Sequence, residues 1–370
     1  MRIGIMLRTL DEKFGIGVYT RNMLDALLKL DRNHEYVLFY KNKKHLGKYA
    51  HYPNVEEKVV NAPNKLLWDQ ATIPLCARQA KVDILFHTKF TVPFLTKCKT
   101  VMVLHGASWF VHPEIYPNKL DLTYIKMVMP LYCRRADSLI ANSNLTKNDF
   151  VNLLHIPPEK IKTIYYGCNP IFRPIHDQEV LSEVRKRYNL PDRFILTVSR
   201  YDPRKNFPTT FRAFTKCHEA GVLKLVAVGK DSWRYKLDCH IGESEFEDDV
   251  IFPGYVEQDD LPAFYNLAEV FIFPSVYEEF GIPLVEAMAC GCPIVASNTG
   301  AIPEITGGAA FLAEPFDADR MAEGIDQLTQ NTDFRRTLIE KGFKRAKNFS
   351  YDKVGEEVLG VLEQVAVRAD

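Results

Sequence analysis

Several features that would quickly assign a function are missing from this 370-residue sequence. Neither charge is in excess, with 47 Lys+Arg against 47 Asp+Glu, so a protein whose main task is to coat nucleic acid is disfavoured. There is no run of 18 apolar residues, which argues against a transmembrane helix. Residues 1–8 are too short and too soon interrupted for a signal peptide, and they are predicted to form the first strand.

Motifs for metals and common cofactors are also lacking. The eight cysteines are scattered, and only Cys290 and Cys292 are close, without the second pair that a zinc site needs. Reduced packing cysteines of a cytosolic protein are therefore expected. No Asp-x-Asp motif stands at a predicted strand end, so we expect no essential metal. No Gly-x-Gly-x-x-Gly opens a helix, which disfavours a Rossmann dehydrogenase.

The balanced total hides a division of charge along the chain. Residues 1–180 hold 25 Lys+Arg and 16 Asp+Glu, whereas residues 181–370 hold 22 Lys+Arg and 31 Asp+Glu. Two halves of opposite charge fit two domains. Either the basic half faces an anionic partner such as a membrane surface, or the two halves simply attract one another.

Short apolar runs alternate with helical patterns, which is typical of βαβ units and parallel sheets. Strands are predicted at 2–7, 36–40, 82–87, 100–105, 138–142 and 161–165, and again at 193–199, 223–229, 250–254, 270–274, 293–297 and 309–312. Prolines interrupt the pattern within 169–174. The chain is therefore predicted to form two doubly wound α/β domains that face each other across a cleft. The boundary between them is predicted after residue 172.

Residues 273–293 carry the strongest chemical pattern. A predicted strand ends at Pro274, a loop carries Glu278, and a helix containing Glu286 begins near Gly281. The free N–H groups at the start of a helix bind anions, and carboxylates accept hydrogen bonds from sugar hydroxyls. One glutamate can hold a hexose and the other a ribose, with a diphosphate between them. The alternative is that both are helix-start charges favoured by the helix dipole.

A basic loop follows the first strand of the second half. Arg200 and Lys205 can clamp a diphosphate, the arginine through its planar fork and the lysine as a point charge. Arg204 is predicted to point outward. The alternative is a solvated turn.

Three features of the first half also draw attention. Gly15 and Gly17 allow close backbone approach at a strand-to-helix turn, and His105 ends a predicted strand. Each is a common structural feature as well. The lysines within 41–48, followed by residues 66–68, could hold the protein on an anionic bilayer, unless they are a solvated loop and a core helix face.

The 273–293 segment resembles the signature of the family 4 glycosyltransferases. That signature is two glutamates separated by seven residues, Phe-Gly after the first acid, and an Ala-Met-Ala-Cys-Gly-x-Pro tail. Glu278, Phe280, Gly281, Glu286 and residues 287–293 match it. Glu279 departs from it, because the family usually has glycine there.

The resemblance implies two facing Rossmann-like domains of the GT-B type and a role for each matched residue. Residues 1–172 with the returning segment 351–370 would form the acceptor-side domain, and residues 173–350 the donor-binding domain. Glu278 would bind donor-sugar hydroxyls, Glu286 the nucleoside ribose, and Arg200 with Lys205 the departing diphosphate. His105 would lie beside the transferred sugar. Phe14 occupies a place where the family often has another glycine. The residues implied to bind the donor, besides the catalytic Arg200, Lys205, Glu278 and His105, are Gly15, Gly17, Val256, Phe280, Gly281, Ile282, Leu284, Glu286 and Gly300.

The resemblance further implies a retaining enzyme that transfers a hexose from a nucleoside diphosphate sugar to a hydroxyl, without cofactor. The sequence most resembles mannosyltransferases of bacterial surface polysaccharides at residues 68–70, 229–233 and 273–277. Mannose from GDP-mannose is therefore expected. The acceptor would be a saccharide or lipid-linked saccharide, and the protein cytoplasmic and peripheral at the inner membrane face. Open alternatives are a transferase using UDP-glucose or a UDP-N-acetylhexosamine, a nucleotide-sugar epimerase or phosphorylase, and a binding-only subunit of a polysaccharide complex.

Overall fold

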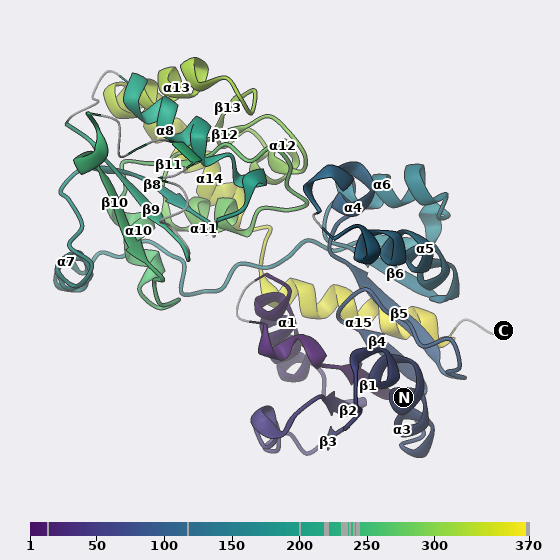
Figure 1. Ribbon diagram of the computed structural model, residues 1–370. Helices are drawn as coiled ribbons and strands as arrows, with labels where there is room; N and C mark the ends of the chain where they lie inside the picture. The colour runs from purple at the N-terminus through teal and green to yellow at the C-terminus, as the bar shows by residue number, and fades with distance from the viewer. Residues whose placement is uncertain are drawn as a thin grey trace. The chain divides into compact units, whose positions relative to one another are not determined.

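The computed structural model describes residues 1–12, 15–116, 118–199, 201–217, 222–230, 236, 238–239, 241 and 245–367. The chain forms two compact units (Figure 1). One consists of residues 1–167 with the helix Tyr351–Val367, and the other of Cys168–Ser350. The sequence analysis placed the boundary five residues later, after residue 172. Each unit contains one parallel sheet with helices, so the predicted fold class is confirmed.

The first unit is built on a seven-stranded parallel sheet with the order β3-β2-β1-β4-β5-β6-β7. Its strands are β1 (Arg2–Met6), β2 (Glu35–Tyr40), β3 (Val55–Val59), β4 (Ile84–His87), β5 (Lys99–Leu104), β6 (Ser138–Ala141) and β7 (Ile161–Thr163). Its helices are α1 (Ile16–Leu30), α2 (Lys65–Leu67), α3 (Ile73–Gln79), α4 (Ser108–Val111), α5 (Lys119–Arg135), α6 (Asn144–Leu154) and α15 (Tyr351–Val367). A π-helical turn, Trp68–Thr72, joins α2 to α3.

The second unit is built on a six-stranded parallel sheet with the order β10-β9-β8-β11-β12-β13. Its strands are β8 (Phe194–Val198), β9 (Lys224–Val228), β10 (Val250–Gly254), β11 (Val270–Phe273), β12 (Ile294–Ser297) and β13 (Phe311–Ala313). Its helices are α7 (Gln178–Arg187), α8 (Phe207–Lys216), α10 (Leu261–Leu267), α11 (Ile282–Cys290), α12 (Ile302–Thr306), α13 (Ala318–Gln330) and α14 (Thr332–Ala346).

The central strands of both sheets are apolar on both faces. Every residue of β11 and β12 is buried, and so are all but the first of β1 and β5. Strands that read as continuous Val/Ile/Leu/Phe runs are those that helices cover on both sides. The apolar runs of the sequence therefore become the layers that hold each unit together.

The edge strand β3 was not predicted, because its sequence, Val-Glu-Glu-Lys-Val, is mostly charged. Its charges are nevertheless partnered. Glu56 pairs with Arg2 and Lys58, and Glu57 accepts a hydrogen bond from Tyr40 at 2.7 Å. Charged side chains are common on edge strands, where they discourage pairing with another chain. The sequence pattern also predicts a helix over residues 232–239, but this segment falls largely outside the described residues.

The last described helix, α15, belongs to the first unit although it follows the whole second unit in sequence. It packs along α1 at Gly355, where an added Cβ would lie 3.2 Å from the carbonyl carbon of Ala26. Its buried residues recur at helical spacing, including Val354, Val358 and Leu362. One unit is thus completed by both ends of the described chain.

Candidate active site

The predicted donor-binding residues gather at one edge of the second sheet. β8 and β11 are neighbours, and the chain builds β9 and β10 on one side of them and β12 and β13 on the other. Open parallel sheets bind ligands outside the carboxyl ends of the strands at such a reversal of strand order. The loop after β8 carries Lys205, and the loop after β11 carries Glu278.

These two loops are fixed to each other by hydrogen bonds. The backbone N–H of Val276 donates to the carbonyl oxygen of Arg204 at 2.8 Å. The buried Asn206 side chain donates to the carbonyls of Pro274 at 3.1 Å and Pro315 at 2.6 Å, and its backbone is left-handed with φ 51°. Asn206 therefore sets both the end of the basic loop and the start of the glutamate loop.

Lys205 and Glu278 hold each other directly. The Lys205 ammonium donates to the carboxylate of Glu278 and lies 5.0 Å from the centre of the Phe273 ring. Glu278 is buried, with 8% of its surface exposed. The structure thus brings together two residues, 73 positions apart, that the sequence analysis assigned to the diphosphate and the sugar of a donor.

The Glu278 loop rests on a third loop, which follows β12. The N–H of Ala301 donates to the carbonyl oxygen of Glu278 at 2.9 Å. Gly300 has φ +57°, and a Cβ there would come within 2.6 Å of that same oxygen. Gly300 therefore acts in the structure as a close-approach residue beneath Glu278, while its predicted contact with a donor stays a prediction.

Glu286 lies within α11, one to two turns from Gly281. Its carboxylate accepts a hydrogen bond from the hydroxyl of Tyr265 at 3.0 Å. Burial raises the pKa of Glu286 to about 7, against a smaller lowering by the Tyr265 bond. The residue as a whole is partly buried. Near neutral pH this carboxyl group can therefore both accept and release a proton.

The other matched residues around α11 shape the loop. Gly281 has φ +91° and caps the helix, which Ile282 begins. Phe280 and Leu284 are buried, and the Phe280 ring meets that of Phe349 edge-on at 5.8 Å. These side chains anchor the glutamate loop to the core. Their donor contacts remain predictions.

Arg204 does not point outward, contrary to the prediction. Its guanidinium donates to Asp202 at 2.7 Å and lies 3.9 Å from the carboxylate of Glu279, the residue that departs from the family signature. Asp202 and Glu279 belong to the two loops that carry Lys205 and Glu278. Arg204 therefore adds an electrostatic link between them.

Three further predicted positions need separate comment. Val256 is buried just beyond the end of β10, at the same edge of the sheet as the glutamate loop. Arg200 and Phe14 lie outside the described residues. The diphosphate clamp is thus described only on its lysine side.

In the first unit, His105 directly follows β5, one residue beyond the strand it was predicted to end, and both of its ring nitrogens have partners within the protein. Nε2 donates to the carbonyl oxygen of Thr88 at 2.7 Å, and Nδ1 accepts from the hydroxyl of Tyr166. Burial lowers the pKa of His105 to about 4, so the ring is neutral near pH 7. A sugar contact at His105 stays a prediction that would require one of these bonds to open.

The glycine turn before α1 is a tight backbone crossing. Gly15 has φ +52°, and a Cβ on Gly17 would overlap the carbonyl oxygen of Glu12 at 1.8 Å. Arg21 holds the same loop by donating to the carbonyls of Leu10 and Glu12 at 2.9 Å each. The turn requires glycine for structural reasons, and a ligand contact there remains predicted.

A polar cavity that the sequence analysis missed lies at the carboxyl ends of β1 and β4. It measures about 10 Å³, room for about one water, and His87 and Asp69 line it. Asp69 pairs with Arg8 at 3.2 Å, yet burial raises its pKa. His87 is fully buried, neither of its ring nitrogens has a hydrogen-bond partner among the described residues, and burial lowers its pKa to about 3. The only signal in the sequence was the Trp68-Asp-Gln70 motif, which the π-helical turn carries.

The membrane contact predicted at 41–48 and 66–68 does not match the structure at two points. Trp68 is buried, and its indole N–H donates to the carbonyl of Val60 at 2.8 Å. Lys48 pairs with Asp25 at 3.4 Å, and His45 lies 2.9 Å from Asp11. Insertion of Trp68 is therefore wrong, and nearby acids offset part of the basic charge of this loop.

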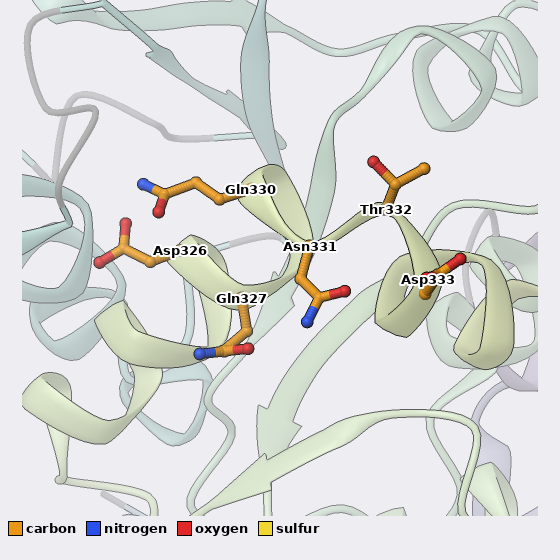
Figure 2. A pocket seen from close by; sticks show the side chains of 6 residues that line it. All are labelled: Asp326, Gln327, Gln330, Asn331, Thr332 and Asp333. Carbon is orange, nitrogen blue, oxygen red and sulfur yellow. The ribbon is translucent and has the colours of Figure 1, made fainter.

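A surface hollow lies away from the predicted site. It measures about 510 Å³ and is lined by polar residues from the end of α13 and the start of α14 (Figure 2). Arg335, in α14, donates to the carbonyl of Glu269, which precedes β11. The hollow is therefore near the amino ends of the strands, opposite the edge that carries the glutamates.

Other features of the described chain can be stated briefly. Among the described residues, no cluster of three or more His, Cys, Asp or Glu side chains is arranged to hold a metal ion. All eight cysteines are free. None of the described helices is both long and apolar enough to cross a bilayer.

Comparison with known proteins agrees with this geometry. Relatives include the O-antigen chain mannosyltransferase B of Escherichia coli, 28% identical over 76% of this chain and 74% of its own. They also include an N-acetylgalactosamine-N,N'-diacetylbacillosaminyl-diphospho-undecaprenol 4-alpha-N-acetylgalactosaminyltransferase of Campylobacter jejuni, 30% identical over 66% of this chain and 65% of its own. The crystal structure of Anabaena HepE with UDP and glucose superposes with a TM-score of 0.78, at 19% identity, over 98% of this chain and 100% of that one.

Two family models match consecutive parts of the chain. The model described as Glycosyltransferase Family 4 matches residues 15–171, and the one described as Glycosyl transferases group 1 matches residues 182–345. The first covers β2 to β7 and α1 to α6 of the first unit, and the second covers the loops that carry Lys205 and Glu278 and the helix that carries Glu286. The chain therefore belongs to the family 4 glycosyltransferases.

Proposed function

We propose that the protein is a retaining glycosyltransferase that moves mannose from GDP-mannose to a hydroxyl group of a saccharide or lipid-linked acceptor, in the synthesis of a surface polysaccharide or glycolipid. The observation that carries the proposal is the Lys205–Glu278 pair at the carboxyl ends of β8 and β11, followed by Glu286 in α11. The diphosphate of a donor is anionic and attracts a lysine, and the hydroxyls of its sugar donate hydrogen bonds to a carboxylate. A bound donor would therefore separate Lys205 from Glu278, with the diphosphate as the new partner of Lys205 and the sugar as the new partner of Glu278.

The choice of donor and acceptor follows from the relatives. The E. coli relative is a mannosyltransferase, which supports mannose. The Campylobacter relative is named for an acceptor carried on diphospho-undecaprenol, which supports a lipid-linked acceptor. A UDP-sugar is the second candidate donor, since HepE was crystallised with UDP and glucose.

The proposed reaction uses few protein groups. The acceptor oxygen bonds to the anomeric carbon on the face from which the diphosphate leaves. The bond between that carbon and the phosphate oxygen breaks, and the acceptor's proton passes to an oxygen of the departing diphosphate. Lys205 stabilises the charge on that diphosphate, a contribution of several kcal/mol in comparable sites. Glu278 orients the sugar, and no metal takes part in this proposal.

Calorimetry and turnover assays with three variants test these roles. Glu278→Gln should lower turnover strongly while GDP binds at least as well as before, since Lys205 is released from its partner. Lys205→Met should weaken GDP binding. Glu286→Ala should weaken GDP by about 1–3 kcal/mol, because the ribose loses charge-assisted hydrogen bonds. If Glu278→Gln weakens GDP as much as Glu286→Ala does, the assignment of sugar and ribose is wrong.

A further inference from the structure

The helix α5 presents an apolar stripe to solvent. Leu120, Tyr124, Met127 and Leu131 are spaced four, three and four residues apart, so they lie on one side of the helix. Leu120 is 83% exposed and Met127 68%, and the other two are about half exposed. The opposite side of the same helix packs Met129, Tyr132 and Cys133 into the core. α5 is thus apolar on both sides, and only one side is covered by the unit.

A neighbouring loop extends this stripe. Phe94 is stacked on the ring of Tyr132 at 5.2 Å, and the Arg135 guanidinium donates to the carbonyl of Thr96 at 2.7 Å, so the loop lies along the end of α5. Leu95, between them in sequence, is 81% exposed. Phe94, Leu95, Leu120, Tyr124, Met127 and Leu131 together form what we call the α5 face. In Figure 1, α5 lies beside β6 in its unit.

The surroundings of the α5 face are basic. Between residues 94 and 135 the sequence holds six Lys and Arg but two Asp and Glu. Lys97, Lys119, Lys126 and Arg134 make no ion pair with any described residue, whereas Glu114, near Lys119, is paired with His112 at 3.0 Å. Exposed apolar side chains with unpaired positive charges at their margins fit a surface that is apolar inside and negative outside.

We infer that the α5 face binds the surface of an anionic phospholipid bilayer, with Leu95, Leu120 and Met127 inserted among the lipids and the four cations at the headgroups. A second copy of the chain fits less well, because a two-fold contact would bring these cations against themselves. The inference concerns the binding surface alone, and it adds to the proposed function a place at which a lipid-linked acceptor would be met.

Flotation with phospholipid vesicles tests the inference on the full-length protein. The protein should float with vesicles of one third phosphatidylglycerol in phosphatidylcholine, less so as salt rises, and hardly with phosphatidylcholine alone. Lys119→Ser with Lys126→Ser should weaken binding by roughly thirtyfold, since each lysine near such a surface contributes about a fivefold gain. Met127→Ser with Leu131→Ser should weaken binding at least roughly tenfold.

Leu153→Ser is the matched control, because Leu153 is 46% exposed on α6 of the same unit. It should bind as the unaltered protein does, and thermal melting should show all variants folded. The inference is overturned if the unaltered protein stays with the unbound fraction, or if the α5 variants float as well as Leu153→Ser. It is also overturned if sedimentation shows a dimer that Met127→Ser with Leu131→Ser dissociates.

The flotation experiment tests the α5 face independently of the proposed function. GDP binding by calorimetry and transfer to a water-soluble acceptor do not depend on the α5 face, and both should be unchanged in the α5 variants. Vesicle binding without sugar transfer would refute the proposed function and leave the surface in place. Transfer without vesicle binding would do the reverse.

Discussion

At the scale of single residues, the site is defined by charges that the fold places in unusual surroundings. Glu286 is the clearest case, because burial raises its pKa to about 7. Glu278, eight positions earlier, is instead held by the ammonium of Lys205. Two glutamates of one motif would therefore meet the proposed donor in different states, one paired with a cation and one with a pKa near neutral.

The titration of Glu286 should be visible in stability. Its pKa is raised above the usual value in the folded state, so its stabilising effect is complete below about pH 4.5 and is lost as pH rises through about 7. Glutamine does not ionise, so Glu286→Gln removes this pH-dependent loss of folding stability. We expect the fall in melting temperature from pH 5 to pH 8 to be smaller in Glu286→Gln than in the unaltered protein. Glu340→Gln, at an exposed position on α14, should behave like the unaltered protein.

The positioning role of Gly300 can be tested against a matched control. Gly308 also has a left-handed backbone, but no atom lies close to the position of its missing Cβ. Gly300 and Gly308 both have positive φ, +57° and +82°, but only Gly300 lies against the Glu278 backbone. Each alanine variant should lose about 1 kcal/mol of unfolding free energy from backbone strain. Gly300→Ala should in addition lower turnover at least roughly tenfold, because a 1 Å displacement of a catalytic group is costly. Equal turnover in the two variants would contradict a positioning role for Gly300.

At the scale of elements, the site depends on contacts between loops that are distant in sequence. The loops after β8, β11 and β12 are fixed to one another by backbone bonds from Val276 and Ala301 and by the side chain of Asn206. None of these contacts follows from local propensity. The rigid strands beneath them set the spacing, and the loops supply the chemistry.

The docking of α15 on α1 can be tested with two glycines of the same helix. Gly355 approaches the backbone of Ala26 and Leu27, whereas a Cβ on Gly360 would meet nothing within 4 Å. Gly355→Leu should destabilise the protein by about 1–3 kcal/mol, as overpacking does. Gly360→Leu should be neutral or slightly stabilising, since glycine is a poor helix former. Denaturant unfolding measures both, and similar losses for the two would mean that α15 is not held as described.

At the scale of the whole molecule, opposite charge is divided between the two units. The first unit, residues 1–167 and 351–370, holds 26 Lys+Arg and 19 Asp+Glu. The second unit holds 21 Lys+Arg and 28 Asp+Glu. The division predicted from the two halves of the sequence therefore persists when the returning helix is counted with the first unit. The basic unit is the one that carries the α5 face.

The reaction as a whole is expected to run without a divalent metal. In the proposed reaction Lys205 and the start of α11 would supply the positive charge that offsets the departing diphosphate, so turnover should survive EDTA within about twofold. The assay is sugar transfer before and after chelation. Loss of activity that Mg²⁺ or Mn²⁺ restores would refute this part of the mechanism, and a chelator-insensitive enzyme would support it.

Much of the architecture was predictable because it depends on local patterns. The apolar runs that become β1, β5, β11 and β12 are unambiguous, since buried parallel strands need little else. The edge strand β3 could not be recognised, because its stability comes from partners such as Arg2 and Tyr40, which lie far away in sequence. The sequence left open whether Trp68 contacts a membrane or packs in the core, because its indole partner Val60 belongs to another segment.

The sequence by itself determined the two-sheet fold class and the glutamate motif, because strand composition and the spacing of Glu278 and Glu286 are local properties of the chain. The pairing of Lys205 with Glu278, the raised pKa of Glu286 and the exposure of one side of α5 depended on tertiary structure. Those three properties come from distance, burial and solvent access. They arise when the strands align and the loops at their ends are brought together.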